Sequence, residues 1–200
     1  MTLAGRPTGY AIASIWTAVL VVSTAHILRG QETPVVARLA LDGWAAVRAL
    51  APIGAPLDRL GPVNDVLKQL DPLLKDPAAA TIRAGLAAAQ EERDEMAVYL
   101  AHARDLSAQI SLTGEVARLP LPIDELEGEL WLEVDHFAAA RDAFQRATRV
   151  SGGRRGWIGL GRALDRLRDT AGACDAYRTA RSTVLSASDA QEAEAYVRQC

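Results

Sequence analysis

Residues 157–180 read WIGLGRALDRLRDTAGACDAYRTA and repeat the pattern of residues 128–147, GELWLEVDHFAAARDAFQRA. The two stretches align at an offset of 33 residues, and their matching positions are small or aromatic: Gly128 with Gly161, Ala140 with Ala173, Phe144 with Tyr177, and Ala147 with Ala180. Small residues let helices approach closely, and the aromatic rings fill the space between neighbouring units. An offset of this size predicts stacked helical hairpins.

The second copy also carries an aromatic residue and a leucine ahead of its glycine. Its full set resembles the pattern of the tetratricopeptide repeat (TPR) family: Trp157, Leu160, Gly161, Ala173, Tyr177 and Ala180. The resemblance covers about a third of the chain and implies an all-α fold, in which the first helix of each hairpin lines a concave, peptide-binding face. We therefore assign residues 121–200 to a short array of two TPR-like repeats with a closing, or capping, helix.

Three features of this region depart from the family or complete it. Glu127 stands where the first repeat prefers an apolar residue, and Thr170 stands where the second prefers an aromatic one. Ser151-Gly152-Gly153 replaces the usual proline at the end of the first repeat, with glycine as the helix stop. Residues 188–200 are polar and helix-forming, and they resemble the solvating helix that closes such arrays.

The resemblance places six charged side chains on the concave face, glutamates from the first repeat and arginines from the second: Glu125, Glu129, Glu133, Arg155, Arg162 and Arg166. The repeat offset sets Glu129 level with Arg162, and Glu133 level with Arg166. These side chains make either a ladder of surface ion pairs, each worth about 0–1 kcal/mol, or a polarised groove that reads a charged peptide. The ladder is the simpler interpretation.

The closing helix of a TPR-like array also implies a pairing of the two cysteines. It is expected to run antiparallel to the helix that holds Cys174, which brings Cys200 near that residue. A disulfide between them would fit an oxidising compartment. The alternative is two unpaired thiols.

Residues 33–110 are predicted to be helical, with proline-marked starts and breaks. Thr33-Pro34 starts one helix, Asp71-Pro72 marks a break in the next, and Asp76-Pro77 starts a third. In the first and third of these pairs, the threonine or aspartate caps the helix and the proline suits its first turn.

The charged run at residues 90–95 has two interpretations. We favour the solvated face of one continuous helix over residues 78–106. If the run is instead a turn, residues 84–103 become a degenerate copy of the later hairpins. Residues 111–122 contain glycine and two prolines and indicate a linker.

Tyr10–Leu28 is a run of 19 residues without Asp, Glu, Lys or Arg. At ~1.5 Å per residue, a helix of this length spans the ~30 Å of membrane hydrocarbon. After a tail of residues 1–9, we predict a single-pass transmembrane signal-anchor in the inner membrane, with the C-terminal domain in the periplasm. Ser23-Thr24-Ala25 offers a cleavage site, so secretion after signal-peptide removal is the alternative. A buried soluble helix is a third reading.

Charge and motif content speak against several classes of function. The net charge is −3 and no long basic block occurs, so nucleic-acid binding is not expected. The histidines, His26, His102 and His136, do not fall at metal-ligand spacing. The loop at residues 152–156 lacks the GxxxxGK[ST] pattern of a phosphate-binding loop. We expect no enzymatic activity, no cofactor, no metal and no small-molecule substrate.

These features predict a membrane-anchored TPR-like adaptor or scaffold that mediates protein–protein interaction at the bacterial cell envelope. Its expected contacts are a protein partner and, through residues 10–28, the membrane. The alternative is an accessory or assembly factor for a periplasmic oxidoreductase system, of the cytochrome c maturation or methanol oxidation type. Small anchored proteins with this repeat accompany such systems.

Overall fold

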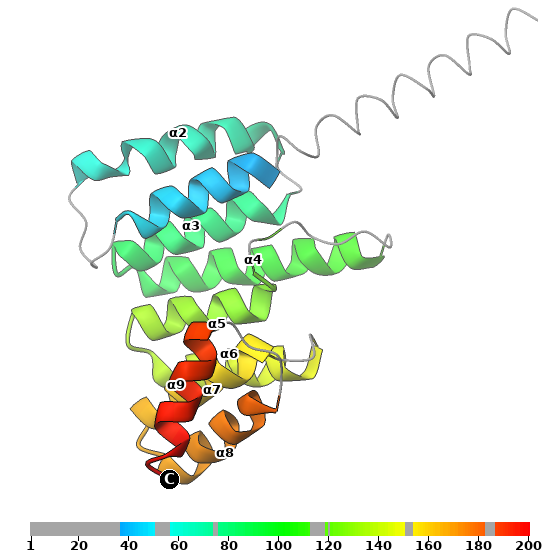
Figure 1. The fold of residues 1–200 in the computed structure, drawn as a ribbon. Coiled ribbons are helices and arrows are strands. Elements are labelled where there is room, and N and C mark those ends of the chain that lie inside the picture. The colour runs from blue at the N-terminus through cyan, green and yellow to red at the C-terminus, as the bar shows by residue number, and fades with distance from the viewer. Residues whose placement is uncertain are drawn as a thin grey trace, which may run out of the picture. The chain divides into compact units, whose positions relative to one another are not determined.

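Helices make up every regular element in the part of the chain that the structure describes, and no strand occurs there (Figure 1). This computed structural model describes residues 37–50, 57–73, 76–112, 119, 121–150, 154–182 and 187–200. Within these residues, the expected all-α class is confirmed. The chain divides into two units, Met1–Arg38 and Leu39–Cys200, and nearly all described residues belong to the second.

The first described helix occupies residues 37–48. After it come a 3-10 helix, η1 (Leu57–Leu60), and the α-helix α2 (Gly61–Leu70). The 3-10 turn η2 (Asp71–Leu73) follows α2 directly, so the break predicted at Asp71-Pro72 is confirmed. The helix start predicted at Thr33-Pro34 lies outside the described residues.

Helix 37–48 approaches α3 (Pro77–Ala89) closely at two glycines. A Cβ atom at Gly43 would lie 2.4 Å from Cδ1 of Ile82, and one at Gly85 would lie 2.8 Å from Cγ1 of Val47. Added at Gly85, the same atom would also lie 3.2 Å from the Trp44 ring. The absence of side chains at both glycines therefore lets the two helices pack tightly and fixes Trp44 against α3.

The charged run at residues 90–95 contains a turn between α3 and α4 (Arg93–Leu112). The favoured prediction of one continuous helix over residues 78–106 is wrong. Glu91 adopts a φ of 62°, a left-handed conformation that ends a helix, and the backbone N–H of Glu92 donates to the carbonyl of Ala87 at 2.9 Å. Glutamate, glutamine and arginine favour helix equally on both sides of the turn, so composition does not mark it.

Two boundaries around this hairpin were also predicted. The start of α3 is confirmed, because the Asp76 side chain accepts a hydrogen bond from the backbone N–H of Ala78 at 2.8 Å. In contrast, α4 runs to Leu112, two residues into the stretch expected to be a linker. Most of the remaining linker, residues 113–118, lies outside the described residues.

Five further helices follow: α5 (Ile123–Glu133), α6 (Phe137–Val150), α7 (Arg154–Arg166), α8 (Thr170–Arg181) and α9 (Ala187–Val197). Among the described residues, three hairpins are formed, α3/α4, α5/α6 and α7/α8. The turn of each one contains a non-glycine residue with a positive φ: Glu91 at 62°, Asp135 at 57° and Arg168 at 63°. Counted from that residue, the same four positions are buried in each hairpin: Ala84, Met96, Leu100 and Ala103; Gly128, Ala140, Phe144 and Ala147; Gly161, Ala173, Tyr177 and Ala180. The hairpin α3/α4 therefore has the register of the other two.

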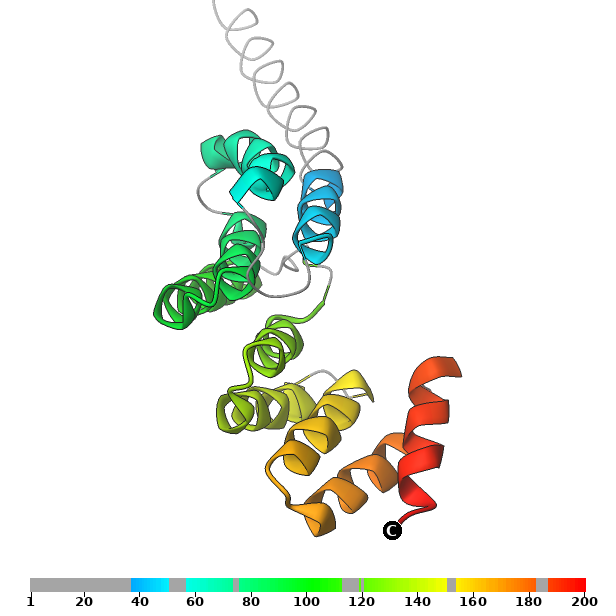
Figure 2. The same ribbon diagram turned by 90° about the vertical axis from the view of Figure 1, so that its left-hand side faces the viewer.

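The hairpins stack in chain order (Figure 2). Each second helix contacts the first helix that follows it, in the pairs α4 with α5, α6 with α7, and α8 with α9. Successive first helices also touch one another, in the pairs α3 with α5, α5 with α7, and α7 with α9. By these contacts, α9 takes the place of the first helix of a further hairpin.

Phe144 shows how tightly the α5–α7 region is packed. Its ring is 1% exposed and lies between glycines of two helices. A Cβ atom at Gly159 of α7 would lie 2.1 Å from Cε1 of this ring, and one at Gly128 of α5 would lie 2.6 Å from Cζ. Both glycines are therefore needed for the ring to fit.

No helix in the described part of the chain is both long and apolar enough to cross a membrane. The segment Tyr10–Leu28, where the sequence predicts the anchor, lies outside the described residues, and so does the predicted cleavage site at Ser23-Thr24-Ala25.

Candidate protein-binding face

The three predicted glutamates of α5 differ in their access to solvent. Glu125 is only 6% exposed, whereas the side chains of Glu129 and Glu133 are 24% and 39% exposed. Glu125 therefore does not offer its carboxylate to solvent. The name inner face is used below for the surface formed by Arg48 of helix 37–48, Glu129 and Glu133 of α5, Arg162 and Arg166 of α7, and Glu192 of α9.

Arg162 lies at the centre of the inner face and connects three first helices. Its Nε and Nη2 donate to the two carboxylate oxygens of Glu192, at 2.8 and 2.5 Å. Its Nη1 lies 3.5 Å from Oε1 of Glu129, so the expected pair is present, and its Nη2 lies 4.0 Å from Asp189. A two-pronged arginine–carboxylate contact fixes geometry as well as charge.

The second predicted pair, Glu133 with Arg166, does not form, and each residue has another partner. Arg166 donates from Nη2 to Oδ1 of Asp135 at 2.9 Å, and its guanidinium lies 4.4 Å above the centre of the Phe137 ring. Glu133 instead accepts from Nη1 of Arg48, at 2.9 Å. The expected pairing of Glu133 with Arg166 is therefore wrong, because a turn residue and helix 37–48 supply nearer partners.

Arg155, the remaining predicted face residue, is exposed on the first turn of α7. It lies two turns before Arg162 on the same helix, and so outside the cluster that Arg162 organises. Its charge is accessible to a partner that extends along α7.

Burial and hydrogen bonding shift the pKa values of groups at the inner face. The hydrogen bonds to Glu192 raise the pKa of Arg162 despite its partial burial, so this arginine stays charged. Burial raises the pKa of Tyr177, whose hydroxyl donates to Oε1 of Glu192 at 3.0 Å. Burial also raises the pKa of Glu133, and the charge of Arg48 opposes that shift.

The inner face carries more negative than positive charge. Arg166 is balanced by the neighbouring Asp135. Around them, Arg48 and Arg162 face three carboxylates that reach solvent, those of Glu129, Glu133 and Glu192. A positively charged segment of a partner therefore complements this surface.

Glu127, on the other side of α5, explains one departure from the TPR pattern. It is 7% exposed, and its Oε2 accepts from Nη2 of Arg146 at 2.7 Å and lies 3.5 Å from Nη1 of Arg104. The Nε1 atom of Trp131 also donates to its Oε1, at 3.4 Å. The carboxylate is tolerated at an otherwise apolar position because two arginines pair with it.

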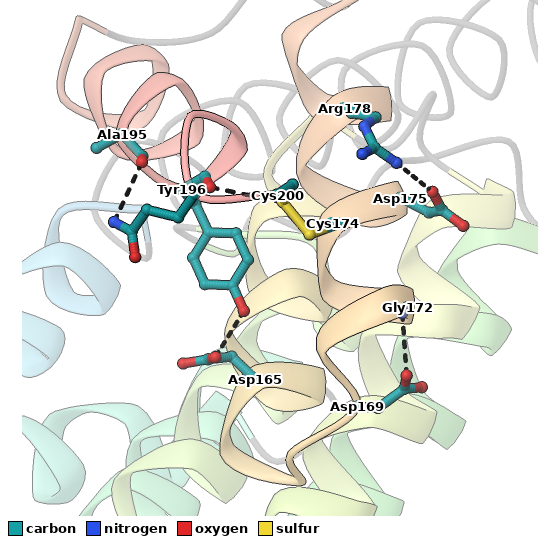
Figure 3. The surroundings of a disulfide bond; sticks show 10 residues. Asp165, Asp169, Gly172, Cys174, Asp175, Arg178, Ala195, Tyr196 and Cys200 are labelled. Carbon is teal, nitrogen blue, oxygen red and sulfur yellow. Dashed lines mark hydrogen bonds and ion pairs between the residues drawn. A yellow bond between two sulfur atoms is a disulfide. The ribbon is translucent and has the colours of Figure 1, made fainter.

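Figure 3 shows the disulfide between Cys174 of α8 and Cys200, whose Cα atoms are 6.0 Å apart. In the same view, the hydroxyl of Tyr196 donates to Oδ1 of Asp165 at 2.6 Å. The Tyr196 ring also stacks on Tyr177, with 4.4 Å between the ring centres. The C-terminal residue, just after α9, is therefore bonded covalently to α8, and α9 itself makes polar contacts with α7.

The described residues contain no group of three or more His, Cys, Asp or Glu side chains placed to hold a metal ion. His102 is exposed on α4, and His136 is exposed in the turn of α5/α6 with its ring centre 5.1 Å from that of Trp131. His26 and Gly152-Gly153 of the glycine loop lie outside these residues.

The chain matches no protein-family model, no curated protein and no solved structure. The inner face combines charge with partial exposure, and its central arginine is held by a two-pronged contact with Glu192.

Several residues of this face were not predicted from the sequence. Glu192 of α9 belongs to it, and Arg48 contributes to it from helix 37–48. A usable signal was present for α9, because Ala193 and Tyr196 have the spacing of Gly161 and Leu164 in α7. No periodic signal connects Arg48 with Glu133, which are 85 residues apart.

Proposed function

We propose that the protein is a membrane-anchored, TPR-like adaptor that binds a protein partner through the inner face. One observation carries the proposal: three hairpins share a register, and their first helices contact one another in sequence. Stacked hairpins of this kind present one continuous surface of first-helix side chains. In this chain that surface is charged rather than apolar.

The choice of partner rests on charge and access. Glu133 and Arg166 have side chains that are 39% and 57% exposed, so a partner can reach them. The excess of carboxylates favours a segment rich in lysine or arginine. Charge complementarity of this type mainly raises the association rate and weakens with salt.

Photo-crosslinking tests whether binding takes place at the inner face. In cells producing the full chain, p-benzoylphenylalanine replaces Glu133 or Arg166, and in a control it replaces Gln145, which is exposed on the second helix α6. We expect one shared adduct from the two inner-face positions, reduced by a Glu129→Lys substitution, and none from position 145. Equal adducts at all three positions, or none at the face, would contradict the proposal. A periplasmic redox enzyme in the adduct would favour the assembly-factor alternative.

The anchor and the compartment are part of the same proposal. The charge-free run of Tyr10–Leu28 supports an anchor, and the Cys174–Cys200 disulfide suits an oxidising compartment. We expect a C-terminally tagged chain to stay with the membrane fraction and to lose its tag when spheroplasts are treated with protease. A tag protected from protease would place the array in the cytoplasm. A soluble, shortened chain would mean that the first segment is a signal peptide.

A further inference from the structure

The helix α9 covers an apolar cluster at the end of the array. The buried members of this cluster are Ile158 of α7, Tyr177 and Ala180 of α8, and Ala193 of α9. Because α9 takes the place of the first helix of a further hairpin, the surface beneath it is shaped to accept a helix. The name end surface is used below for Ile158, Tyr177 and Ala180 together with the neighbouring Arg162.

One carboxylate of α9 pairs with two polar groups of the end surface. The carboxylate of Glu192 accepts two hydrogen bonds from the guanidinium of Arg162, at 2.8 and 2.5 Å, and one from the hydroxyl of Tyr177, at 3.0 Å. Asp189, 4.0 Å from the same guanidinium, is also on α9, whereas Glu129, at 3.5 Å, is on α5. If α9 left, Arg162 would therefore lose its closest carboxylate and become accessible to another one.

The non-covalent hold on α9 is small for a helix of this array. Of its apolar side chains, that of Ala193 is fully buried, whereas those of Tyr196 and Val197 are partly covered. By comparison, α7 buries Ile158, Leu160, Ala163 and Leu164. The helix α9 has 11 residues, and isolated helices shorter than about 12–15 residues are marginal in water. Its position therefore depends strongly on whatever else restrains it.

The disulfide supplies that restraint and is accessible from one side (Figure 3). Cys174 of α8 is 6% exposed, whereas Cys200, which follows α9, is exposed. Exposed disulfides are reduced more readily than enclosed ones, and regulatory disulfides are drawn from this group. A thiolate can therefore approach the bond at Cys200.

We propose that the Cys174–Cys200 disulfide is a redox switch for α9, and that its reduction opens the end surface to a helix of a partner protein. The reductant is a protein dithiol. One of its thiolates attacks Sγ of Cys200, and Cys174 leaves as a thiolate; its second thiol then displaces Cys200 from the mixed disulfide. The chain gains two thiols, with protons from the dithiol, and the dithiol becomes a disulfide. Because Arg162 belongs to the inner face, the proposal rests on the proposed function and names what regulates access to that face.

The helix α9 itself defines the chemistry of the partner helix. That helix presents a carboxylate to the guanidinium of Arg162 and the hydroxyl of Tyr177, as Glu192 does. One position later it has a small residue, in the place of Ala193. Four positions after the carboxylate it has an aromatic ring, because the ring of Tyr196 stacks on Tyr177 with 4.4 Å between their centres. A lysine in place of the carboxylate would be repelled by Arg162.

A fluorescein-labelled peptide with the sequence of α9, Ala187–Val197, tests the switch on the full-length chain in a nonionic detergent. Its binding is followed by fluorescence polarisation before and after treatment with dithiothreitol, a small dithiol. The peptide binds only those molecules whose own α9 has left, so reduction should lower its apparent Kd by about tenfold or more. The same peptide with Glu192→Lys should bind the reduced chain at least fivefold more weakly. Equal affinity in the two redox states, or no binding after reduction, would overturn the proposal.

Variants of the chain separate the disulfide from other effects of the reductant. Cys174→Ala/Cys200→Ala should bind the peptide as the reduced chain does and should not respond to dithiothreitol. Glu192→Gln weakens the docking of the chain's own α9 and leaves the end surface intact, so it should tighten peptide binding further after reduction. Glu194→Gln, exposed on the same helix, is the matched control and should have little effect.

Hydrogen exchange and photo-crosslinking complete the test. On reduction, exchange should become faster in α9, while α5/α6 keep their protection and show that the array stays folded; unchanged protection of α9 would contradict the switch. If the switch fails but the adducts at positions 133 and 166 persist, the proposed function survives. If the peptide binds on reduction but those adducts are missing, the switch is supported and the proposed binding at the inner face fails.

Discussion

The hairpins α3/α4 and α7/α8 place side chains at the same positions but fill them with different chemistry. In α7/α8, Gly161 lies under the ring of Tyr177, and a Cβ there would come within 2.8 Å of that ring. In α3/α4, the corresponding positions are Ala84 and Leu100, both buried. The pair of glycine and tyrosine in one hairpin is replaced by alanine and leucine in the other. The added methyl group offsets the smaller side chain, so the total volume of the pair is conserved. The register of a helical hairpin therefore persists where its sequence signature does not.

The largest expected effect comes from removing the central side chain of each hairpin. We expect Phe144→Ala to lower the free energy of unfolding by about 4 kcal/mol and Leu100→Ala by about 3 kcal/mol, because each leaves a cavity in a fully packed site. Val98→Ala on the exposed surface of α4 is the control and should stay within about 0.5 kcal/mol. Urea unfolding measures all three. A loss below 1 kcal/mol for Leu100→Ala would mean that α3/α4 is not packed like its counterpart.

A disulfide joins α8 to Cys200. The hairpin α3/α4 has no such bond, because the chain contains two cysteines and both form this one. The cysteines are 26 residues apart, and closing a loop of this size stabilises the folded chain by about 3.5 kcal/mol in the chain-entropy treatment. We expect Cys174→Ala/Cys200→Ala to lower the Tm, and reductant to lower the Tm of the unaltered chain but not that of the variant. Two titratable thiols in unreduced protein would refute the bond.

A smaller effect is expected at Gly159, where an added methyl group would overlap the Phe144 ring. Since that ring is enclosed on both sides, Gly159→Ala should lower the free energy of unfolding by about 2 kcal/mol. Gly61→Ala is the matched control, because no atom lies within 4 Å of a Cβ at that position. It should be neutral or slightly stabilising. Equal values for the two variants in urea unfolding would argue against the close approach of α5, α6 and α7.

The smallest expected effect is on stability at alkaline pH and comes from Tyr196 of α9. Burial, followed by the hydrogen bond to Asp165, raises the pKa of Tyr196 to about 12, above its usual value of 10.0. The folded chain then holds a proton that the unfolded chain loses, so this contribution is complete below pH 10 and is lost as the pH rises through about 12. Stability should fall less steeply above pH 10 in Tyr196→Phe than in the unaltered chain. Identical slopes in unfolding series at pH 9 to 12 would contradict the shift.

The sequence predicted the parts of this fold that rest on local or periodic chemistry. The 33-residue repeat of glycine and aromatic residues located α5 to α8, and Asp76-Pro77 marked the start of α3. The turn at Glu91 was only the alternative to a continuous helix, because alanine, methionine and leucine at the repeat positions do not stand out in a helix-forming stretch.

The candidate site was predicted less completely than the fold. Glu129 and Arg162 were expected to meet, because the repeat offset sets them side by side. The contact of Arg48 with Glu133 depends on how helix 37–48 packs against its neighbours. That packing rests on Gly43 and Gly85, and neither glycine belongs to the repeat.

The central claim is that α3/α4 belongs to the same array as the later hairpins and shares their stability. Hydrogen exchange followed by mass spectrometry tests this most directly, on the unaltered chain and on Phe144→Ala. In a stacked array each unit is stabilised by its neighbours, so the variant should exchange faster in α3/α4 and α7/α8 as well as in α5/α6. Faster exchange in α5 to α9 with unchanged protection in α3/α4 would show that the first hairpin is an independent unit, and would contradict the account.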